Sequence, residues 1–155
     1  MMRIDVVCVG RLKERHWREA ADEYLKRLTP YARVSVVEIP DRDVTADEAR
    51  ALSAEGAGIL GAVSGDAVVV ALEIGGVERS SEGFAAWLEE CATSGRGHVA
   101  FVIGGAAGLH PDVLARADGR MSLGPMTLPH QMARVVLLEQ IYRAFRIARG
   151  EPYHR

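Results

Sequence analysis

The sequence has few of the features that mark membrane, disulfide-bonded or zinc proteins. No apolar run approaches the roughly 20 residues of a membrane helix, and the start "MMRIDVVCVG" carries an acid and lacks a signal-peptide cleavage site. Its two cysteines, Cys8 and Cys91, lie in apolar periodic segments with no second Cys or His at ligand spacing. We therefore expect a cytoplasmic protein with reduced core cysteines and no metal.

An excess of positive charge is also absent, because the formal net charge is -2. The charge is uneven: residues 1–34 hold 8 basic and 5 acidic side chains, residues 35–119 hold 5 and 14, and residues 120–155 hold 6 and 2. The basic ends are either solvated helix faces or a local anion-binding surface. The overall acidity argues against indiscriminate coating of nucleic acid but leaves a specific, partner-assisted contact open.

What the sequence does contain is an alternation of strand and helix patterns. Segments rich in Val and Ile predict strands at residues 3–9, 33–39, 67–73, 98–104 and 120–124. Helical periodicity predicts helices at about 17–28, 45–60, 81–91 and 129–149. The second should open with a capping box of Thr45 and Glu48 and bury Ala49, Leu52, Ile59 and Leu60. The whole pattern predicts one α/β domain, residues 1–155, with a mainly parallel sheet covered by helices on both faces.

The last predicted helix is apolar on more than one side. Its wide face comprises Leu137, Leu138, Ile141, Tyr142, Phe145 and Ala148, whereas Met132 and Val136 lie opposite. Such a helix must be buried on two sides. The second covering surface could be another subunit related by a twofold axis or the rest of the same chain, and the sequence leaves both open.

Three predicted strand ends carry glycine-containing loops, at residues 72–76, 103–108 and 123–129. Each alone is consistent with an ordinary turn, but ligands of open α/β sheets bind where such loops converge. The run "GGAAGLHP" has neither the lysine and hydroxyl of a P-loop nor the spacing of a dinucleotide fingerprint. Bare backbone and apolar side chains instead suit a flat, uncharged ring such as adenine.

Three segments carry a family resemblance: "FVIGGAAGL", "LGPMTLPHQMARVVLLEQIYRA" and the ending "RGEPYHR". They resemble the large-subunit ribosomal RNA pseudouridine-N3 methyltransferases, small members of the SPOUT class of knotted methyltransferases. The resemblance implies an α/β fold with a C-terminal trefoil knot, a homodimer and S-adenosylmethionine as cofactor. It also implies methyl transfer to N3 of a pseudouridine in 23S ribosomal RNA.

The same resemblance implies cofactor-binding positions, all within the three loops. They are Leu72, Gly104, Leu123, Gly124, Pro125, Met126, Thr127 and Leu128. One departure is that Ala106 and Ala107 stand where we expect Pro and Glu in the family. This change leaves one fewer carboxylate to act as a base near the site.

The implied reaction requires in-line alignment and loss of the proton from N3 of the base. Our candidate catalytic residues are His154, because histidine changes charge near neutrality, Arg143 as a cation for the anionic ring, and Tyr153 to stack or hydrogen-bond the base. The last five residues of a chain are usually frayed. Because the family ends in the same motif, we favour a functional tail.

Further basic residues predict contacts with RNA phosphates, which fix position without reading sequence. They are Arg146, Arg149 and Arg155, although Arg146 and Arg149 would equally suit a solvated helix end. His130 and Arg134 are weaker candidates, and we expect Arg134 to bridge a subunit contact. With no separate RNA-binding domain in so short a chain, we expect recognition of the target in an assembled ribosome.

One alternative class is a non-catalytic dimer module that binds an adenosyl ligand. It would keep the loops but have no use for Arg143 or the tail.

Overall fold

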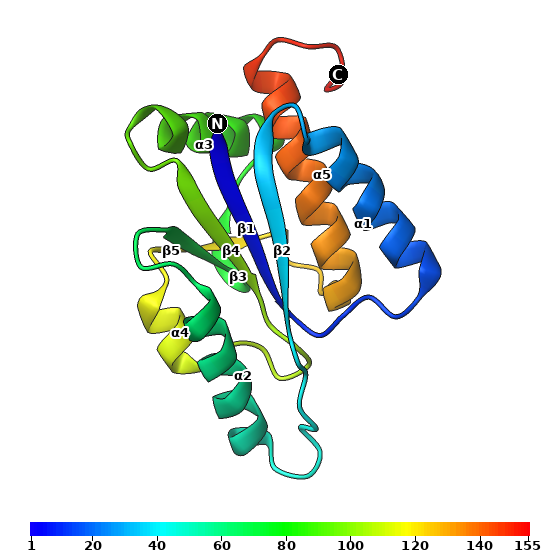
Figure 1. Ribbon diagram of the computed structural model, residues 1–155, viewed down its shortest axis with the longest axis vertical. Coiled ribbons are helices and arrows are strands. Elements are labelled where there is room, and N and C mark those ends of the chain that lie inside the picture. The colour runs from blue at the N-terminus through cyan, green and yellow to red at the C-terminus, as the bar shows by residue number, and fades with distance from the viewer.

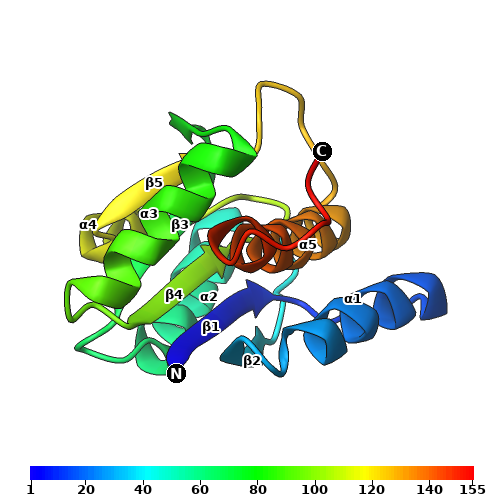
Figure 2. The same cartoon turned by 90° about the horizontal axis from the view of Figure 1, so that it is seen from above.

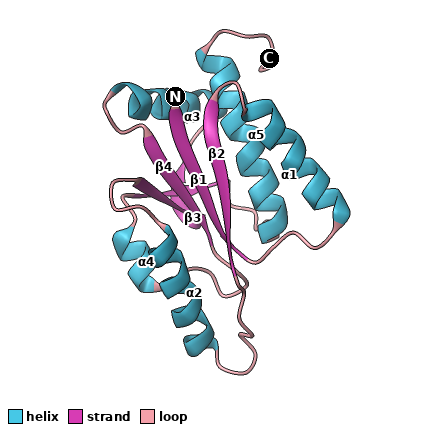
Figure 3. Cartoon of the chain, in the orientation of Figure 1, coloured by secondary structure: helices cyan, strands magenta, loops and turns pink.

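The computed structural model describes all 155 residues as a five-stranded, wholly parallel sheet with helices on both faces (Figures 1 and 3). The strands lie in the order β2-β1-β4-β3-β5. Their bounds are β1 Met2–Val9, β2 Ala32–Ile39, β3 Val68–Glu78, β4 His98–Ile103 and β5 Gly119–Ser122. The helices are α1 Arg15–Leu28, α2 Glu48–Ala62, α3 Ser81–Thr93, α4 Pro111–Arg116 and α5 His130–Ala148. The predicted α/β class and parallel sheet are confirmed.

Each face of the sheet has its own apolar core, because successive strand residues point to opposite faces. Helices α1, α3 and α5 pack on one face around Phe101 and Leu138, and both cysteines are buried there. Helices α2 and α4 pack on the other face around Ile59 and Val102. Figures 1 and 2 show α2 on the side of the sheet away from α1 and α5.

The start of α2 differs from the predicted capping box. Asp47 is the N-cap and accepts a hydrogen bond from the Arg50 amide at 3.1 Å, whereas Thr45 bonds to Asp43. Thr and Asp are both favoured N-cap residues, so the sequence alone did not distinguish Thr45 from Asp47 as the N-cap. The helix consequently buries Ala51, Glu55, Gly56 and Ile59. The predicted burial of Ala49 and Leu60 is wrong, because both are exposed.

Strand β3 is longer than predicted and absorbs the first of the expected loops. Residues 72–76 lie inside the strand, and its pairing with β5 shifts register between Leu72 and Val77. A Cβ at Gly76 would lie 2.7 Å from the backbone nitrogen of Met121. Glycine here therefore allows close approach of two strands at a bulge rather than a turn.

Helix α5 begins and ends as predicted. Pro129 precedes its first residue, and Gly150 follows its end with a φ of +65°, a conformation that favours glycine. Met132 and Val136 are only half-buried within the chain, and Ala148 is exposed, contrary to its predicted place in the apolar face. The side of α5 that carries Val136 is thus incompletely covered by its own chain.

Candidate active site

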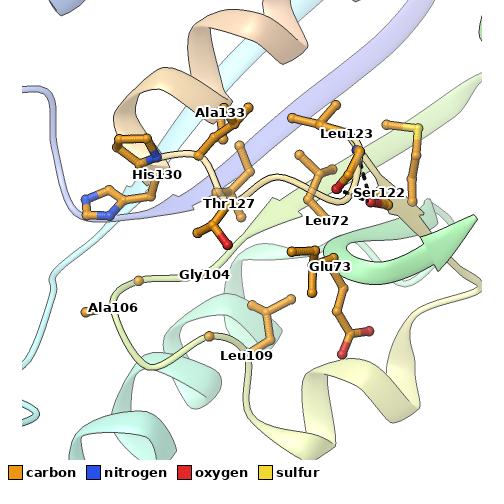
Figure 4. A pocket seen from close by; sticks show the side chains of 18 of the residues that line it. Leu72, Glu73, Gly104, Ala106, Leu109, Ser122, Leu123, Thr127, His130 and Ala133 are labelled. Carbon is orange, nitrogen blue, oxygen red and sulfur yellow. Dashed lines mark hydrogen bonds between the residues drawn. The ribbon is translucent and has the colours of Figure 1, made fainter. Parts of the chain in front are cut away.

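A cavity of about 560 Å³ lies at the carboxyl edge of the sheet (Figure 4). It is formed by Leu72 to Ile74 of β3, by residues 103–109 after β4, and by residues 121–130 together with the first turn of α5. Eleven of its 20 lining residues are hydrophobic. All three sequence segments that we expected to converge therefore do so, and the volume is within the usual range for small-molecule sites.

The loop after β4 folds back tightly on itself. Gly105 and Gly108 form an isolated β-bridge, and Gly108 adopts a φ of +80°. A Cβ at Gly104 would lie 2.6 Å from the carbonyl oxygen of Gly108, closer than any real Cβ contact. Gly104 is therefore fixed as glycine by backbone packing, and it lines the cavity.

The loop between β5 and α5 is held by Ser122. Its hydroxyl accepts from the Gly124 amide at 3.1 Å and donates to the Gly124 carbonyl at 3.0 Å (Figure 4). Gly124 has a φ of +129°, so it can turn the chain here without strain. Our sequence reasoning missed Ser122, although a serine beside a glycine turn is a recognised signal of such local bonding.

Seven of the eight expected cofactor-binding residues line this cavity. They are Leu72, Gly104, Leu123, Gly124, Met126, Thr127 and Leu128, whereas Pro125 is not among the lining residues. The donor set fits an adenosyl ligand, because backbone amides and carbonyls lie among apolar side chains and no cation gathers there to bind phosphates.

A buried carboxylate lies behind the glycine loop. Glu55 is only 3% exposed, and its Oε2 accepts from the Arg42 amide at 2.9 Å. Its Oε1 has no partner and would be 3.5 Å from a Cβ at Gly105. Nothing in the sequence indicated that Glu55 would be buried in α2.

The candidate catalytic residues Arg143, Tyr153 and His154 gather around Glu139, farther along α5 than the cavity. The Oε1 atom of Glu139 accepts from Arg143 Nη2 at 2.6 Å, from Arg143 Nε at 3.0 Å and from the Tyr153 hydroxyl at 3.0 Å. Arg143 Nη1 lies 3.1 Å from Nδ1 of His154, whose Nε2 lies 2.6 Å from Glu82. The tail is therefore ordered by side-chain bonds rather than frayed.

These contacts constrain the chemistry of each group. Since the Arg143 guanidinium can only donate, Nδ1 of His154 accepts and its Nε2 donates to Glu82. Burial, followed by the bond to Glu139, raises the pKa of Tyr153 to about 12. The bonds to Glu139 also raise the pKa of Arg143. At neutral pH the tail thus presents a neutral phenol and a permanent cation, which suit stabilisation of an anion better than proton removal.

The remaining predicted arginines have different surroundings. Arg146 bonds to the Tyr31 hydroxyl at 3.2 Å and to Glu151 at 2.8 Å, so its side chain is engaged within the chain. Arg149 lies over the Tyr31 ring at 4.5 Å, and Arg155 is exposed.

Arg134 is 3% exposed and bonds to Glu38 and to the Gly10 carbonyl. The prediction that Arg134 bridges a subunit contact is therefore wrong, because its guanidinium is used inside one chain.

The cavity and the tail lie apart in one chain. His130 lines the cavity at the first turn of α5, whereas the tail packs against Glu139 and Arg143. Nine residues of helix separate His130 from Glu139, a rise of about 14 Å. Figure 1 shows the C-terminus at the end of α5 remote from the segment that joins β5 to α5. Along α5, the residue that lines the cavity and those that hold the tail are therefore separated.

No three His, Cys, Asp or Glu side chains are grouped so that they could hold a metal ion. No helix has both the length and the apolar character needed to cross a membrane.

Comparisons with known proteins agree on one family. A family model described as "Predicted SPOUT methyltransferase" matches residues 2–154. The protein named ribosomal RNA large subunit methyltransferase H of Listeria welshimeri is 50% identical, covering 99% of this chain and all of that protein. The protein of the same name from Bacillus thuringiensis is 49% identical with the same coverage.

Solved structures share the fold at low identity. A probable methylase family protein from Haemophilus influenzae matches with a TM-score of 0.55 and 16% identity, covering 98% of this chain and 70% of that one. A probable methyltransferase from Bordetella pertussis matches with a TM-score of 0.57 and 13% identity, covering 93% and 95%. At this identity they support the architecture alone.

Proposed function

The chain belongs to the SPOUT methyltransferase family, and on that premise we propose that it methylates N3 of a pseudouridine in large-subunit ribosomal RNA, with S-adenosylmethionine as methyl donor. The observation that carries the proposal is the cavity of about 560 Å³ in which the three glycine-containing segments converge. The names of the two relatives support ribosomal RNA as the substrate.

The residues that would hold the donor are Leu72, Gly104 and residues 123–128. When bound, S-adenosylmethionine supplies an electrophilic methyl group for an in-line displacement. Gly104 and Gly124 would offer peptide groups without a side chain in the way, and Leu72, Leu123 and Leu128 would exclude water from a bound adenine ring. This arrangement accounts for binding and orientation, which supply much of the rate in such a transfer.

The residues that would act on the acceptor are Arg143, Tyr153 and His154. Removal of the N3 proton leaves negative charge on the pyrimidine ring, which Arg143 would stabilise. The neutral Tyr153 hydroxyl can donate a hydrogen bond to a base carbonyl once it leaves Glu139. His154 becomes available as a base only when the bond from Arg143 to its Nδ1 is released.

We further propose a homodimer in which the tail of one copy completes the cavity of the other. The spacing along α5 supports this arrangement, because one copy alone separates His130 from Glu139 by about 14 Å along the helix axis. The half-buried Met132 and Val136 and the exposed Ile74 (57%) and Met126 (82%) provide apolar surface beside the cavity. A twofold axis would complete both sites at once. The trefoil knot stays a prediction.

The direct test supplies methyl-labelled S-adenosylmethionine with ribosomes and follows label in 23S RNA by mass spectrometry of nucleosides. We expect one N3-methylpseudouridine per ribosome. Absence of label in RNA, with the cofactor bound in calorimetry, would favour the adenosyl-ligand module instead. Deletion of residues 153–155 separates the two functions further, because the enzyme should lose methyl transfer whereas a ligand module should be unaffected.

A second arm of that test compares intact ribosomes with naked 23S RNA as substrates. The described residues form one α/β unit, and Arg143 and Arg146 are both engaged within it. We therefore expect the assembled ribosome to supply part of the recognition surface, so that intact ribosomes are methylated far better than naked 23S RNA. Equal efficiency on both would refute recognition of the assembled particle.

A further inference from the structure

A second cavity, of about 680 Å³, lies beside the start of α1 and is unusually basic. Its charged lining consists of Arg11, Lys13, Arg18 and Arg134 against Asp22 and Glu38. It adjoins the first cavity, because His130 and Ala133 line that one and Arg134, on the same turns of α5, lines this one. The two cavities therefore lie on either side of the start of α5.

Three of these cations have no acidic partner. None of the ion pairs in the chain involves Arg11, Lys13 or Arg18. Arg18 donates to the carbonyls of Leu12 and Lys13, which holds the loop in place without neutralising its charge. Arg11 and Lys13 are exposed. The cavity thus keeps a positive charge that the chain itself does not balance.

Arg134 provides an independent indication of a missing partner. Its side chain is buried, with Nη1 bonded to Glu38 at 2.8 Å and Nη2 to the Gly10 carbonyl at 2.9 Å. Its Nε is buried without any hydrogen-bond partner. A buried donor without a partner is costly and rare in folded proteins, and the same side chain lines this cavity.

The start of α1 adds to the positive potential. Glu14 occupies the N-cap position but makes no side-chain capping bond, and the first turn contains no acidic residue. Cations at a helix N-terminus are unfavourable, whereas an anion there is stabilised by the free amides and the helix dipole. Arg18 in this position therefore favours a bound anion, whereas Arg15 is paired with Glu19 at 2.7 Å.

We propose that this cavity binds a backbone phosphate of the ribosomal RNA next to the nucleotide that enters the first cavity. The inference rests on the proposed function and deepens it, because a phosphodiester held beside the start of α5 would fix the position of the RNA relative to the methyl donor. Such a contact sets register without reading sequence. It also places a main RNA contact at the amino-terminal segment rather than on Arg146.

The test measures binding of fluorescently labelled protein to 70S ribosomes over about 50–200 mM potassium chloride at constant magnesium. The double variant R11Q/K13Q is compared with K26Q/R33Q, which removes the same charge from exposed residues outside the cavity. We expect R11Q/K13Q to bind about 10-fold more weakly at low salt and to flatten the logarithmic salt dependence by about 1 to 2. Calorimetry should show unchanged affinity for S-adenosylmethionine in both variants.

Equal binding by R11Q/K13Q and K26Q/R33Q would overturn the inference. A free-anion site is distinguished by calorimetry with inorganic phosphate: phosphate binding lost in R11Q/K13Q, with unchanged ribosome binding, would also overturn the RNA assignment. If the wild-type protein methylates ribosomes while R11Q/K13Q behaves as its control, only this inference fails. If the wild-type protein neither binds nor methylates ribosomes, the proposed function fails first.

Discussion

The cavity and the tail differ in what they are made of. The cavity is formed mainly by backbone and apolar side chains, and Gly104 is confined by the Gly108 carbonyl. The tail is formed by polar side chains that converge on Glu139. The first region can select a ligand by shape, and the second can respond to charge. They should therefore fail in different ways: added atoms should damage the cavity, whereas removed charge should damage the tail.

The largest effect is expected from Gly104→Ala, which breaks the cavity. The new Cβ would lie 2.6 Å from the Gly108 oxygen, so the loop must move. We expect affinity for S-adenosylmethionine to fall by about 10²-fold, because forcing an extra carbon into a packed site costs up to about 3 kcal/mol. Calorimetry measures this, with Gly97→Ala as control, because a Cβ there meets nothing within 4 Å. Unchanged affinity in Gly104→Ala would contradict the role of this loop.

Arg143→Gln breaks the tail instead. Loss of a cation aimed at developing charge typically costs about 10²-fold in kcat. Affinity for S-adenosylmethionine should stay at the wild-type value, because Arg143 is assigned to the acceptor base and does not line the cavity of its own chain. Arg143→Lys should recover part of kcat, since it keeps the charge but loses the two-pronged bond to Glu139. A loss of cofactor affinity with unchanged kcat would assign Arg143 to the wrong region.

Tyr153→Phe sharpens the comparison by removing one hydroxyl and keeping the ring. We expect kcat to fall by about 10-fold through the lost hydrogen bond. The shape of the pH–rate profile between about pH 6 and 9 should not change, because a pKa raised to about 12 keeps Tyr153 neutral throughout. The raised pKa stabilises the fold fully below about pH 10, and this contribution is lost as the pH rises through about 12. Loss of an alkaline limb in the variant would show that Tyr153 ionises during turnover.

Ser122→Ala should give the smallest effect, within the cavity region. It removes the two hydrogen bonds to Gly124, each worth about 0.5–1.5 kcal/mol. We expect the backbone conformation of the loop to stay otherwise unchanged. We expect a 3- to 10-fold loss of cofactor affinity, equivalent to about one such bond. Ser53→Ala, on the exposed side of α2, is the control. A loss as large as that of Gly104→Ala would mean that side chains hold the cavity as firmly as backbone does.

The same difference explains what the sequence could predict. The bounds of β1, β2, β4 and β5, to within two residues, and two of the three ligand loops followed from local signals, namely apolar runs and glycine spacing. The bulge in β3 did not, because Gly75 and Gly76 indicate a turn unless the approach of β5 is known. The six-residue helix α4 was too short to give a periodic pattern.

The tail was harder to predict because its bonds join distant residues. The spacing of Glu139 and Arg143 is that of a helical ion pair, so the sequence did contain a signal for this contact. Their links to Tyr153 and His154, and from there to Glu82, depend on how the last residues fold back over α5 and α3. The orphaned oxygen of Glu55 gave no local signal at all.

The central claim is that cavity and tail from two copies form one site, and mixing two inactive variants tests it most directly. Gly104→Ala and Arg143→Gln are unfolded, combined and refolded together, and methylation of ribosomes is measured. In a twofold dimer, half of the randomly paired dimers hold one intact site, so activity should return to roughly a quarter of the wild-type value. Mixed dimers that form but remain inactive would contradict the account.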